Sequence, residues 1–417
     1  MNLPLALYRG VTGLLEPWVP SLLTGRAKRG KEDVARIGER LGKASRPRPD
    51  GNLVWLHGVS VGESLSLLPL VLALRAARPD LALLVTSGTR TSADLLAQRL
   101  PPEVVHQYAP VDAPGTVAQF LDYWRPSLGV LVESELWPNL ILGARARGVK
   151  LALMSARMTQ ASAEGWGRIP GTARTLLSAF DLILPQDSET GARLAKLRAK
   201  IQGHLNLKRL GEPLPCDLSE LSRLRADLAE RSVILASNTH PGEEAMIVKA
   251  VRGLGALLVI TPRHPERGGT IAAELTGLGL KVARRSLGEA LTPDTAVYLA
   301  DTLGEMGLFY SLADVAVMGG SFVAGIGGHN PLEPARLGVP VVTGPYVFNA
   351  AELYDEMFAC VAAMPAADAE TLTRHLKGLM ANPQIRRQMS DAGLAYAARQ
   401  GATLEAALDL LIPLLPA

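Results

Sequence analysis

"LVWLHGVSVGESLSLLPLVLALR", residues 53–75, is the stretch that decides the fold. Its first four residues are apolar, as expected of a buried strand, and the chain then runs through Gly58 into a long helical pattern that begins near Glu63. A short buried strand followed at once by a helix is the first half of a βαβ unit, in which the next strand lies parallel to the first.

The same alternation of strands and amphipathic helices recurs in two series along the chain. It predicts right-handed crossovers and parallel sheets covered by helices on both faces. We therefore expect an α/β protein with two Rossmann-like, doubly wound domains. The expected strands are 53–58, 81–88, 104–110, 128–135, 150–157 and 181–187 in the first series, and 232–238, 256–263, 281–285, 296–301, 315–321 and 340–345 in the second.

A stretch over residues 206–230, with Gly and Pro in its first half, separates the two series, and residues 368–415 have a helical pattern. Ligands of doubly wound sheets bind beyond the carboxyl ends of the strands, so two facing domains are expected to line a shared cleft with those loops. The predicted organisation is an N-terminal membrane-associating segment (1–30), a first, acceptor-binding domain (31–210), a linker (211–230) and a second, nucleotide-binding domain (231–417).

Composition excludes several classes of protein. The 417 residues are 48% hydrophobic and 20% charged, which is typical of a globular chain. A formal net charge of +3 gives no electrostatic reason to expect nucleic-acid binding. Cys216 and Cys360, the chain's two cysteines, are too far apart in sequence to suggest a metal or redox motif, and they fit a reducing compartment.

The first 25 residues are mostly apolar, and "RAKRGK" (26–31) then adds four positive charges. Arg9, Glu16, Pro17 and Pro20 interrupt the apolar run, so a regular transmembrane helix is not expected. We predict an interfacial segment that lies on a membrane, with Trp18 near the headgroups and the basic residues on anionic lipid. The alternative is a helix docked on the protein's own surface.

The turn after the first strand supports two kinds of chemistry. Gly58-x-Ser60-x-Gly62 is the pattern of a hydrolase nucleophile elbow, although here it follows the first strand and lacks the strands and oxyanion loop that precede such elbows. Ser60 and Glu63 also fit a capping box at the start of a helix. Glu63 is therefore either a cap or a general base, and the neighbouring glycines favour close approach of a substrate.

The second domain carries a glycine-rich loop in "GGSFVAGIGGHNPLEPARLGVPVVTGP" (319–345). A helix opened by Pro331 is expected to present backbone N–H groups to a phosphate, with Glu333 available to ribose hydroxyls. "ITPRHPER" (260–267) and "DTLGEMG" (301–307) follow other strands, so they are expected at the same edge of the sheet. An arginine in the first of these loops can pair with phosphate. No D-x-D motif occurs in the sequence, so no metal ion and no other cofactor is expected.

The segments "HGVSVGE", "VESELWPN", "TPRHPER", "DTLGEM" and "GGHNPLEPARLGVPVVTGP" resemble the Kdo transferases, over about residues 30 to 400. The resemblance implies an inverting GT-B glycosyltransferase that moves 3-deoxy-D-manno-octulosonic acid (Kdo) from CMP-Kdo to an anionic lipid A precursor. It also implies work at the cytoplasmic face of the inner membrane, in lipopolysaccharide biosynthesis. Two other classes stay open: a membrane-bound CMP-binding protein without turnover, and a serine hydrolase that uses Ser60.

The resemblance assigns Glu63 as the catalytic base and Glu133 as the carboxylate that assists the transition state. One position departs from the family, which has lysine in a G-x-L-K segment. Here "GHLNLKRL" (203–210) places Asn206 at that position, and Lys208 lies two residues on. In an extended segment the two residues face the same side, so Lys208 is predicted to substitute. The residues matching the CMP-binding loops are Pro262, Arg263, Leu303, Gly304, Glu305, Asn330, Pro331, Leu332 and Glu333.

Overall fold

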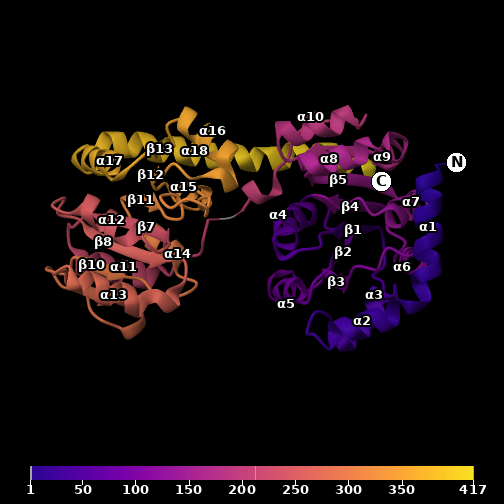
Figure 1. Ribbon diagram of the computed structural model, residues 1–417, viewed down its shortest axis with the longest axis horizontal. Coiled ribbons are helices and arrows are strands. Elements are labelled where there is room, and N and C mark those ends of the chain that lie inside the picture. The colour runs from indigo at the N-terminus through magenta and orange to yellow at the C-terminus, as the bar shows by residue number, and fades with distance from the viewer. Residues whose placement is uncertain (1, 212, 417) are drawn as a thin grey trace. The chain divides into compact units, whose positions relative to one another are not determined.

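The structure is a computed structural model that describes residues 2–211 and 213–416. It divides into two compact units, one formed by Met1–Gly211 with Gly401–Ala417 and the other by Glu212–Gln400. Each unit is built on one parallel β-sheet with helices packed around it (Figure 1). The α/β class expected from the sequence is therefore confirmed.

The sheet of the first unit has the strand order β3-β2-β1-β4-β5-β6, with every pair parallel. Side chains of β1 alternate between two apolar clusters: Leu53 and Trp55 join one, whereas Val54 and Leu56 join the other. This alternation places a core on each face of the sheet, as a doubly wound sheet requires. The strands are β1 (Leu53–His57), β2 (Ala82–Ser87), β3 (Val105–Tyr108), β4 (Leu128–Val132), β5 (Lys150–Ala156) and β6 (Leu182–Pro185).

The helices of the first unit begin at capping side chains or prolines in most cases. They are α1 (Leu3–Leu15), α2 (Val19–Ala27), α3 (Ile37–Arg40), α4 (Val61–Ala77), α5 (Arg90–Arg99), α6 (Pro114–Trp124), α7 (Pro138–Ala146), α8 (Gln160–Gly167), α9 (Pro170–Leu177) and α10 (Ser188–Lys196). Short 3-10 helices cover Glu16–Trp18 (η1), Val34–Arg36 (η2) and Leu207–Arg209 (η3).

The N-terminal helix α1 lies against α6 and α7 (Figure 1). Leu5 is buried in the core, and the Tyr8 hydroxyl donates to Asp112 Oδ2 at 3.0 Å. Asn139 Nδ2 donates to Thr12 Oγ1 at 3.0 Å, and Glu16 accepts from two backbone N–H groups at the start of α6. One face of α1 is thus docked on the protein, as the alternative reading of this segment expected. Over the part of the chain that the structure describes, no helix is long and apolar enough to cross a membrane.

The sheet of the second unit is also parallel, with the order β13-β12-β11-β7-β8-β10-β9. The strands are β7 (Val233–Thr239), β8 (Leu257–Pro262), β9 (Val282–Arg284), β10 (Val297–Leu299), β11 (Val315–Met318), β12 (Val341–Thr343) and β13 (Ala363–Pro365). Its helices are α11 (Leu218–Leu228), α12 (Glu243–Val251), α13 (Gly268–Gly277), α14 (Met306–Leu312), α15 (Leu332–Arg336), α16 (Ala351–Ala359), α17 (Ala369–Ala381) and α18 (Pro383–Leu411). Short 3-10 helices lie at η4 (Pro265–Arg267), η5 (Arg285–Leu287) and η6 (Phe348–Ala350). Helix α18 continues into the first unit, where η7 (Ile412–Leu414) follows it.

Two boundaries differ from those expected. Most of the second half of the expected linker is helix α11, whose Leu224 is fully buried in the core of the second unit. At the other end, residues 401–417 belong to the first unit, although the sequence pattern assigned them to the second domain. The reason is apolar burial: Leu408 and Leu411 join the cluster that contains Leu70 of α4.

In each sheet the chain reverses its direction of strand addition at one point. The first sheet grows from β1 to β2 and β3 on one side, and to β4, β5 and β6 on the other. The second sheet reverses between β7 and β11 in the same way. The loops on either side of such a switch point diverge and leave a crevice at the carboxyl ends of the strands, where ligands of this fold class bind.

Candidate active site

Ser60 and Glu63 form the start of α4, directly after β1. The Glu63 N–H donates to Ser60 Oγ at 3.3 Å, and the Ser60 hydroxyl donates to Glu63 Oε1 at 2.9 Å. Glu63 Oε2 accepts from the Val59 and Ser60 N–H groups at 2.7 and 3.4 Å. The capping box expected from the sequence is therefore present, and it fixes the orientation of a half-buried carboxylate beside the first switch point.

Ser60 lacks the partner that a serine nucleophile requires. No histidine hydrogen-bonds its hydroxyl within residues 2–211 and 213–416. The histidine nearest in sequence, His57, is buried with Nδ1 2.9 Å from Thr86 Oγ1 and Nε2 3.5 Å from Glu135 Oε2. A serine hydrolase activates its nucleophile through an adjacent base. The geometry therefore favours the capping role of Ser60.

Gly58 is explained by packing. An added Cβ would lie 3.1 Å from Glu63 Cβ and 3.1 Å from Val132 Cγ2, which is tighter than ordinary contact. At Gly62, by contrast, an added Cβ would meet no atom within 4 Å. Gly58 thus allows the turn to pack against β4.

Glu133 follows β4 on the other side of the first switch point, and it has the left-handed backbone angle φ 57°. Non-glycine residues in this region are strained, and such strain is concentrated at functional sites. The Glu133 side chain is only 6% exposed, and Lys208 Nζ lies 2.6 Å from its Oε1. A nearly buried carboxylate is thereby paired with a half-exposed ammonium group, at the edge where Glu63 also lies.

Lys208 reaches Glu133 by a route that differs from the expected one. Residues Leu207–Arg209 form the 3-10 helix η3 rather than an extended segment, so the expectation that Asn206 and Lys208 face the same side was wrong. The physical cause is a cap: Asn206 Oδ1 accepts from the Lys208 N–H at 3.1 Å. The Leu207 N–H is held by Ser155 Oγ, on another residue with a left-handed φ, 51°.

Two loops of the second unit are joined by the buried side chain of Glu243. Its carboxylate accepts from the N–H groups of His240, after β7, and of Gly320 and Phe322, after β11. Glu243 is fully buried, so these three hydrogen bonds compensate the cost of removing its charge from water. The result is a fixed pair of loops on either side of the second switch point.

The imidazoles of His240 and His329 meet between these loops. Their Nε2 atoms lie 3.0 Å apart, and the ring planes are nearly parallel, with a centroid distance of 5.2 Å and an interplanar angle of 13°. Burial lowers the pKa of His329 to about 4 and also lowers the pKa of His240. Neither residue was among the site residues expected from the sequence, although "NTHPGEE" (238–244) lies at the end of a buried strand, where ligand-binding residues of this fold class occur.

Arg263 and Glu333 lie near this pair. Arg263 follows β8 with an exposed side chain, and its N–H donates to Thr239 O at 3.0 Å. Burial raises the pKa of the Glu333 carboxyl, and the positive charges of Arg336 and Arg263 partly offset the rise. Arg263 is therefore close enough to Glu333 and His329 to influence both electrostatically.

The loop after β10 has an exposed part, Leu303 and Gly304, and a part that is bound to the rest of the protein through Glu305. Leu303 is 82% exposed, and Gly304 has φ 85°, a conformation that favours glycine. Glu305 is bound by Arg285, with Nη2 2.5 Å from Oε1, and this contact lowers the pKa of Glu305. The carboxylate of Glu305 thus holds the loop internally, whereas Leu303 and Gly304 lie at its surface.

The loop that precedes α15 differs from the predicted phosphate site. Asn330 Oδ1 accepts from the Leu332 N–H at 3.1 Å, and α15 itself is only 5 residues long. One of the backbone N–H groups expected to bind phosphate is therefore already used by Asn330. The expectation of an anion site made by the N-terminus of this helix is thus weakened, and positive side chains become the stronger candidates.

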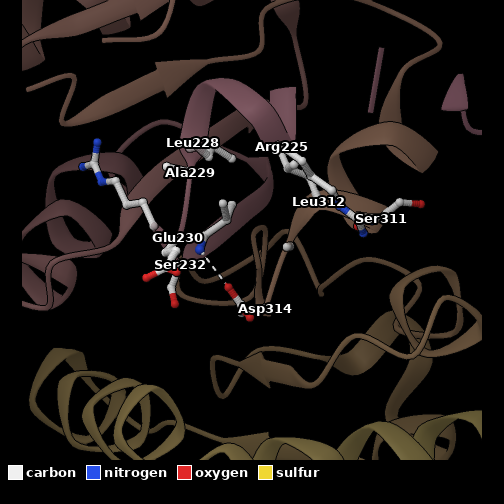
Figure 2. A pocket seen from close by; sticks show the side chains of 11 residues that line it. Arg225, Leu228, Ala229, Glu230, Ser232, Ser311, Leu312 and Asp314 are labelled. Carbon is white, nitrogen blue, oxygen red and sulfur yellow. Dashed lines mark hydrogen bonds between the residues drawn. The ribbon is translucent and has the colours of Figure 1, made fainter. Parts of the chain in front are cut away.

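A surface pocket of about 310 Å³ opens elsewhere on the second unit (Figure 2). It lies between the end of α11 and the loop that joins α14 to β11, where the Val233 N–H donates to Asp314 Oδ2 at 2.9 Å. This is the amino-terminal edge of β7 and β11, opposite to the edge where doubly wound sheets bind ligands. We therefore do not assign the nucleotide to it. Within the described residues, no cluster of His, Cys, Asp or Glu is arranged to hold a metal ion.

Comparison with known proteins gives consistent matches. A family model described as 3-Deoxy-D-manno-octulosonic-acid transferase (kdotransferase) matches residues 35–209. A probable mitochondrial 3-deoxy-D-manno-octulosonic acid transferase of Arabidopsis thaliana is 36% identical over 398 residues, which cover 91% of this chain and 88% of the relative. A 3-deoxy-D-manno-octulosonic acid transferase of Bordetella pertussis is 36% identical over 389 residues, which cover 90% of each chain.

The fold is also shared with more distant proteins. The crystal structure of a glycosyltransferase from Rickettsia africae covers 88% of this chain and 99% of that chain, with a TM-score of 0.59 and 10% sequence identity. At that identity the likeness shows the fold alone, which is GT-B-like with two parallel sheets.

Proposed function

This chain belongs to the family of 3-deoxy-D-manno-octulosonic acid (Kdo) transferases, and from that premise we propose that Glu63, Glu133 and Lys208 form its catalytic centre. It is a CMP-Kdo-dependent glycosyltransferase of lipopolysaccharide core biosynthesis. The acceptor in this proposal is an anionic lipid A precursor, and the reaction inverts the anomeric centre. The observation that carries the proposal is the ion pair between Lys208 and Glu133, at the same sheet edge as the capped carboxylate of Glu63.

In the proposed reaction, Glu63 removes the proton from an acceptor hydroxyl, and the resulting oxygen attacks the anomeric carbon of Kdo. The bond between that carbon and the phosphate oxygen breaks, and its electron pair leaves with CMP. General-base catalysis of this kind contributes about 10²–10⁴-fold to the rate. Glu133 stabilises positive charge that develops on the sugar, and Lys208 holds Glu133 in place through the ion pair.

The second unit holds the donor in this proposal. Support comes from Arg263, Leu303 and Gly304, on loops after the carboxyl ends of β8 and β10, and from Glu333, in the first turn of α15. Pro262, Glu305, Asn330, Pro331 and Leu332 set the backbone of those loops. Arg263 is the one exposed guanidinium among them, and a charge-assisted hydrogen bond from it suits a phosphate oxygen.

We also propose that the exposed face of the N-terminal segment binds the cytoplasmic surface of the inner membrane, where the lipid acceptor is found. Leu3, Leu7, Val11, Leu14, Trp18 and Leu22 are all exposed and recur at helical spacing. An unpartnered apolar stripe of this kind is typical of an interfacial helix. Lys28, Arg29 and Lys31 follow it with exposed side chains, and each contributes about 1 kcal/mol near an anionic surface.

Vesicle sedimentation tests the membrane proposal. Leu7→Asp combined with Leu14→Asp should abolish binding to vesicles that contain anionic lipid, because both changes place a charge in the apolar stripe. Leu72→Asp is the matched control, since Leu72 is 49% exposed on α4, outside the stripe. Unchanged binding of the double variant would contradict the proposal.

The catalytic proposal is tested by mass spectrometry of the product formed from CMP-Kdo and a tetra-acylated lipid A precursor. The expected product is the precursor with Kdo added, and its mass also counts the Kdo residues. Release of CMP without glycosylation of the lipid would contradict the assigned acceptor. CMP binding without any turnover would indicate a transferase that has lost catalysis.

A further inference from the structure

The contact between His240 and His329 bridges the second switch point. His240 follows β7, and His329 lies on the glycine-rich loop that follows β11. Neutral imidazoles 3.0 Å apart share one hydrogen bond, in which one Nε2–H donates to the other Nε2. One added proton preserves this bond, because it binds at the free Nδ1 of the donating ring. A second added proton would set two N–H groups against each other, so the pair holds at most one positive charge.

The pair is rigidly held but chemically available. Glu243 fixes both loops through backbone N–H groups, and the Tyr354 hydroxyl donates to His329 O at 2.8 Å. Neither Nδ1 atom has a hydrogen-bond partner among the side chains and backbone groups that the structure describes. Both rings are only partly buried, so these atoms can meet a ligand.

Arg263 is the exposed positive charge beside the pair, whereas Arg267 is paired with the buried carboxylate of Glu244 at 2.8 Å. Arg263, Arg267 and His264 face His240 and disfavour its protonation, whereas the carboxylate of Glu243 favours it. Protonation of His329 is similarly disfavoured by burial and by the positive charge of Arg263. Glu243 already accepts three backbone N–H groups, so its charge is largely compensated. The neutral histidine pair and the exposed guanidinium of Arg263 together provide a site that suits an anionic ligand.

We propose that His240 and His329 bind the phosphate of the CMP group and take up one proton when it binds. This inference rests on the proposed function, in which the second unit holds CMP-Kdo. As the bond from the phosphate oxygen to the anomeric carbon breaks, the oxygen gains the electron pair, and the protonated pair donates a hydrogen bond to the negative charge. The acceptor's proton goes separately to Glu63, so charge and protons balance.

A definite pH dependence follows. The pKa of the pair lies below the ordinary histidine value of about 6.5 in the free protein, and bound phosphate raises it. A group whose pKa rises on binding strengthens binding below the pKa of the complex and loses this effect as the pH rises through it. CMP affinity should therefore fall as the pH increases from neutral, even though CMP itself stays a dianion above its own pKa of about 6.

Calorimetry of the full chain in buffers of different ionisation enthalpy, at pH 7.5, measures the proton directly. CMP should bind with uptake of a substantial fraction of one proton, whereas cytidine, which lacks the phosphate, should bind without uptake. His240→Gln and His329→Gln should each abolish the uptake and weaken CMP binding about tenfold, because each removes half of the pair. His375→Gln, at a half-buried position on α17, is the matched control and should change neither.

The outcomes separate the two proposals. CMP binding without proton uptake, uptake with cytidine, or uptake retained in both glutamine variants would overturn the role of the pair and leave the donor site intact. Absence of CMP binding to the unaltered chain would overturn the donor site itself. If the glutamine variants do not fold, NMR of ¹⁵N-labelled histidine in the unaltered chain still decides, because on addition of CMP the ring signals of the pair must move towards the protonated form by the amount that one added proton causes.

Discussion

The two switch points of this chain share a topology and differ in charge. Around the first, between β1 and β4, the proposed functional side chains are the carboxylates of Glu63 and Glu133, with Lys208 as a counter-charge. Around the second, between β7 and β11, the proposed functional side chains are the imidazoles of His240 and His329, with Arg263 nearby. The same kind of switch point thus suits opposite tasks in the two units. Carboxylates can accept a proton and stabilise positive charge, whereas imidazoles and a guanidinium stabilise a departing phosphate.

The buried anchors of the two sites also differ. At the first, Glu63 is itself part of a capping box, so one residue is both structural and available for chemistry. At the second, Glu243 holds the loops from a fully buried position, and separate residues are proposed to contact the ligand. Substitution therefore has to be designed differently at each site, because a change at Glu63 removes a cap as well as a base.

The largest effect is expected at Glu63. Glu63→Gln should lower kcat by about 10² or more, the usual scale for loss of a general base, while CMP affinity stays unchanged. Glutamine can still accept from the Val59 N–H and is a normal residue of a capping box, so the fold should be preserved. Steady-state kinetics and calorimetry with CMP are the measurements.

The matched control is Ser60→Ala, which removes the cap and leaves the carboxylate. It should cost about 0.5–2 kcal/mol of stability with most of the turnover retained. If Glu63→Gln kept near-normal kcat, the role of Glu63 would be capping alone.

The next effect is expected on donor affinity. Arg263→Ala should weaken CMP binding by roughly 1.5–3 kcal/mol, the value of a hydrogen bond to a charged group. Arg252→Ala, at an exposed position beyond α12, is the control and should leave the affinity unchanged. Equal CMP affinity in Arg263→Ala and Glu333→Ala, measured by calorimetry, would place the nucleotide elsewhere.

Much of this organisation could be predicted from the sequence, because it depends on local signals. Strand periodicity gave the two parallel sheets, and the spacing of Ser60 and Glu63 gave the capping box. Contacts between residues that are distant in the sequence were harder to predict. The return of α18 to the first unit depends on which cluster has room for Leu408 and Leu411, and a helical pattern does not carry that information.

The sites show the same limit. Lys208 was expected in the first site, but its path through a 3-10 turn depends on one side-chain cap at Asn206. His240 and His329 are 89 residues apart in sequence, so their contact required the strand order before it could be seen. Residue types near strand ends were thus predictable, whereas their pairing was not.

A smaller effect is expected at Lys208. Lys208→Ala should lower kcat about tenfold with little change in CMP affinity, because the ion pair with Glu133 serves the transition state rather than donor binding. Lys208→Arg should recover part of the loss, since it restores the positive charge. Lys200→Ala, another exposed lysine of the first unit, is the control. Full activity in Lys208→Ala would remove this residue from the first site.

The smallest effect is expected at Asn206. Substitution there changes the position of the Lys208 ammonium group without removing its charge. Asn206→Ala keeps Lys208 but removes the acceptor that caps η3, which is worth about 1 kcal/mol for a typical cap. The turn should then be formed in a smaller fraction of molecules, and kcat should fall by about two- to fivefold with unchanged CMP affinity. Asn206→Ser retains a capping oxygen and should stay close to the original rate.

Asn206→Lys restores the more usual family residue but loses the cap, so it should not exceed that rate. A gain of activity in Asn206→Lys would show that position 206, rather than 208, is the better place for the ammonium group next to Glu133.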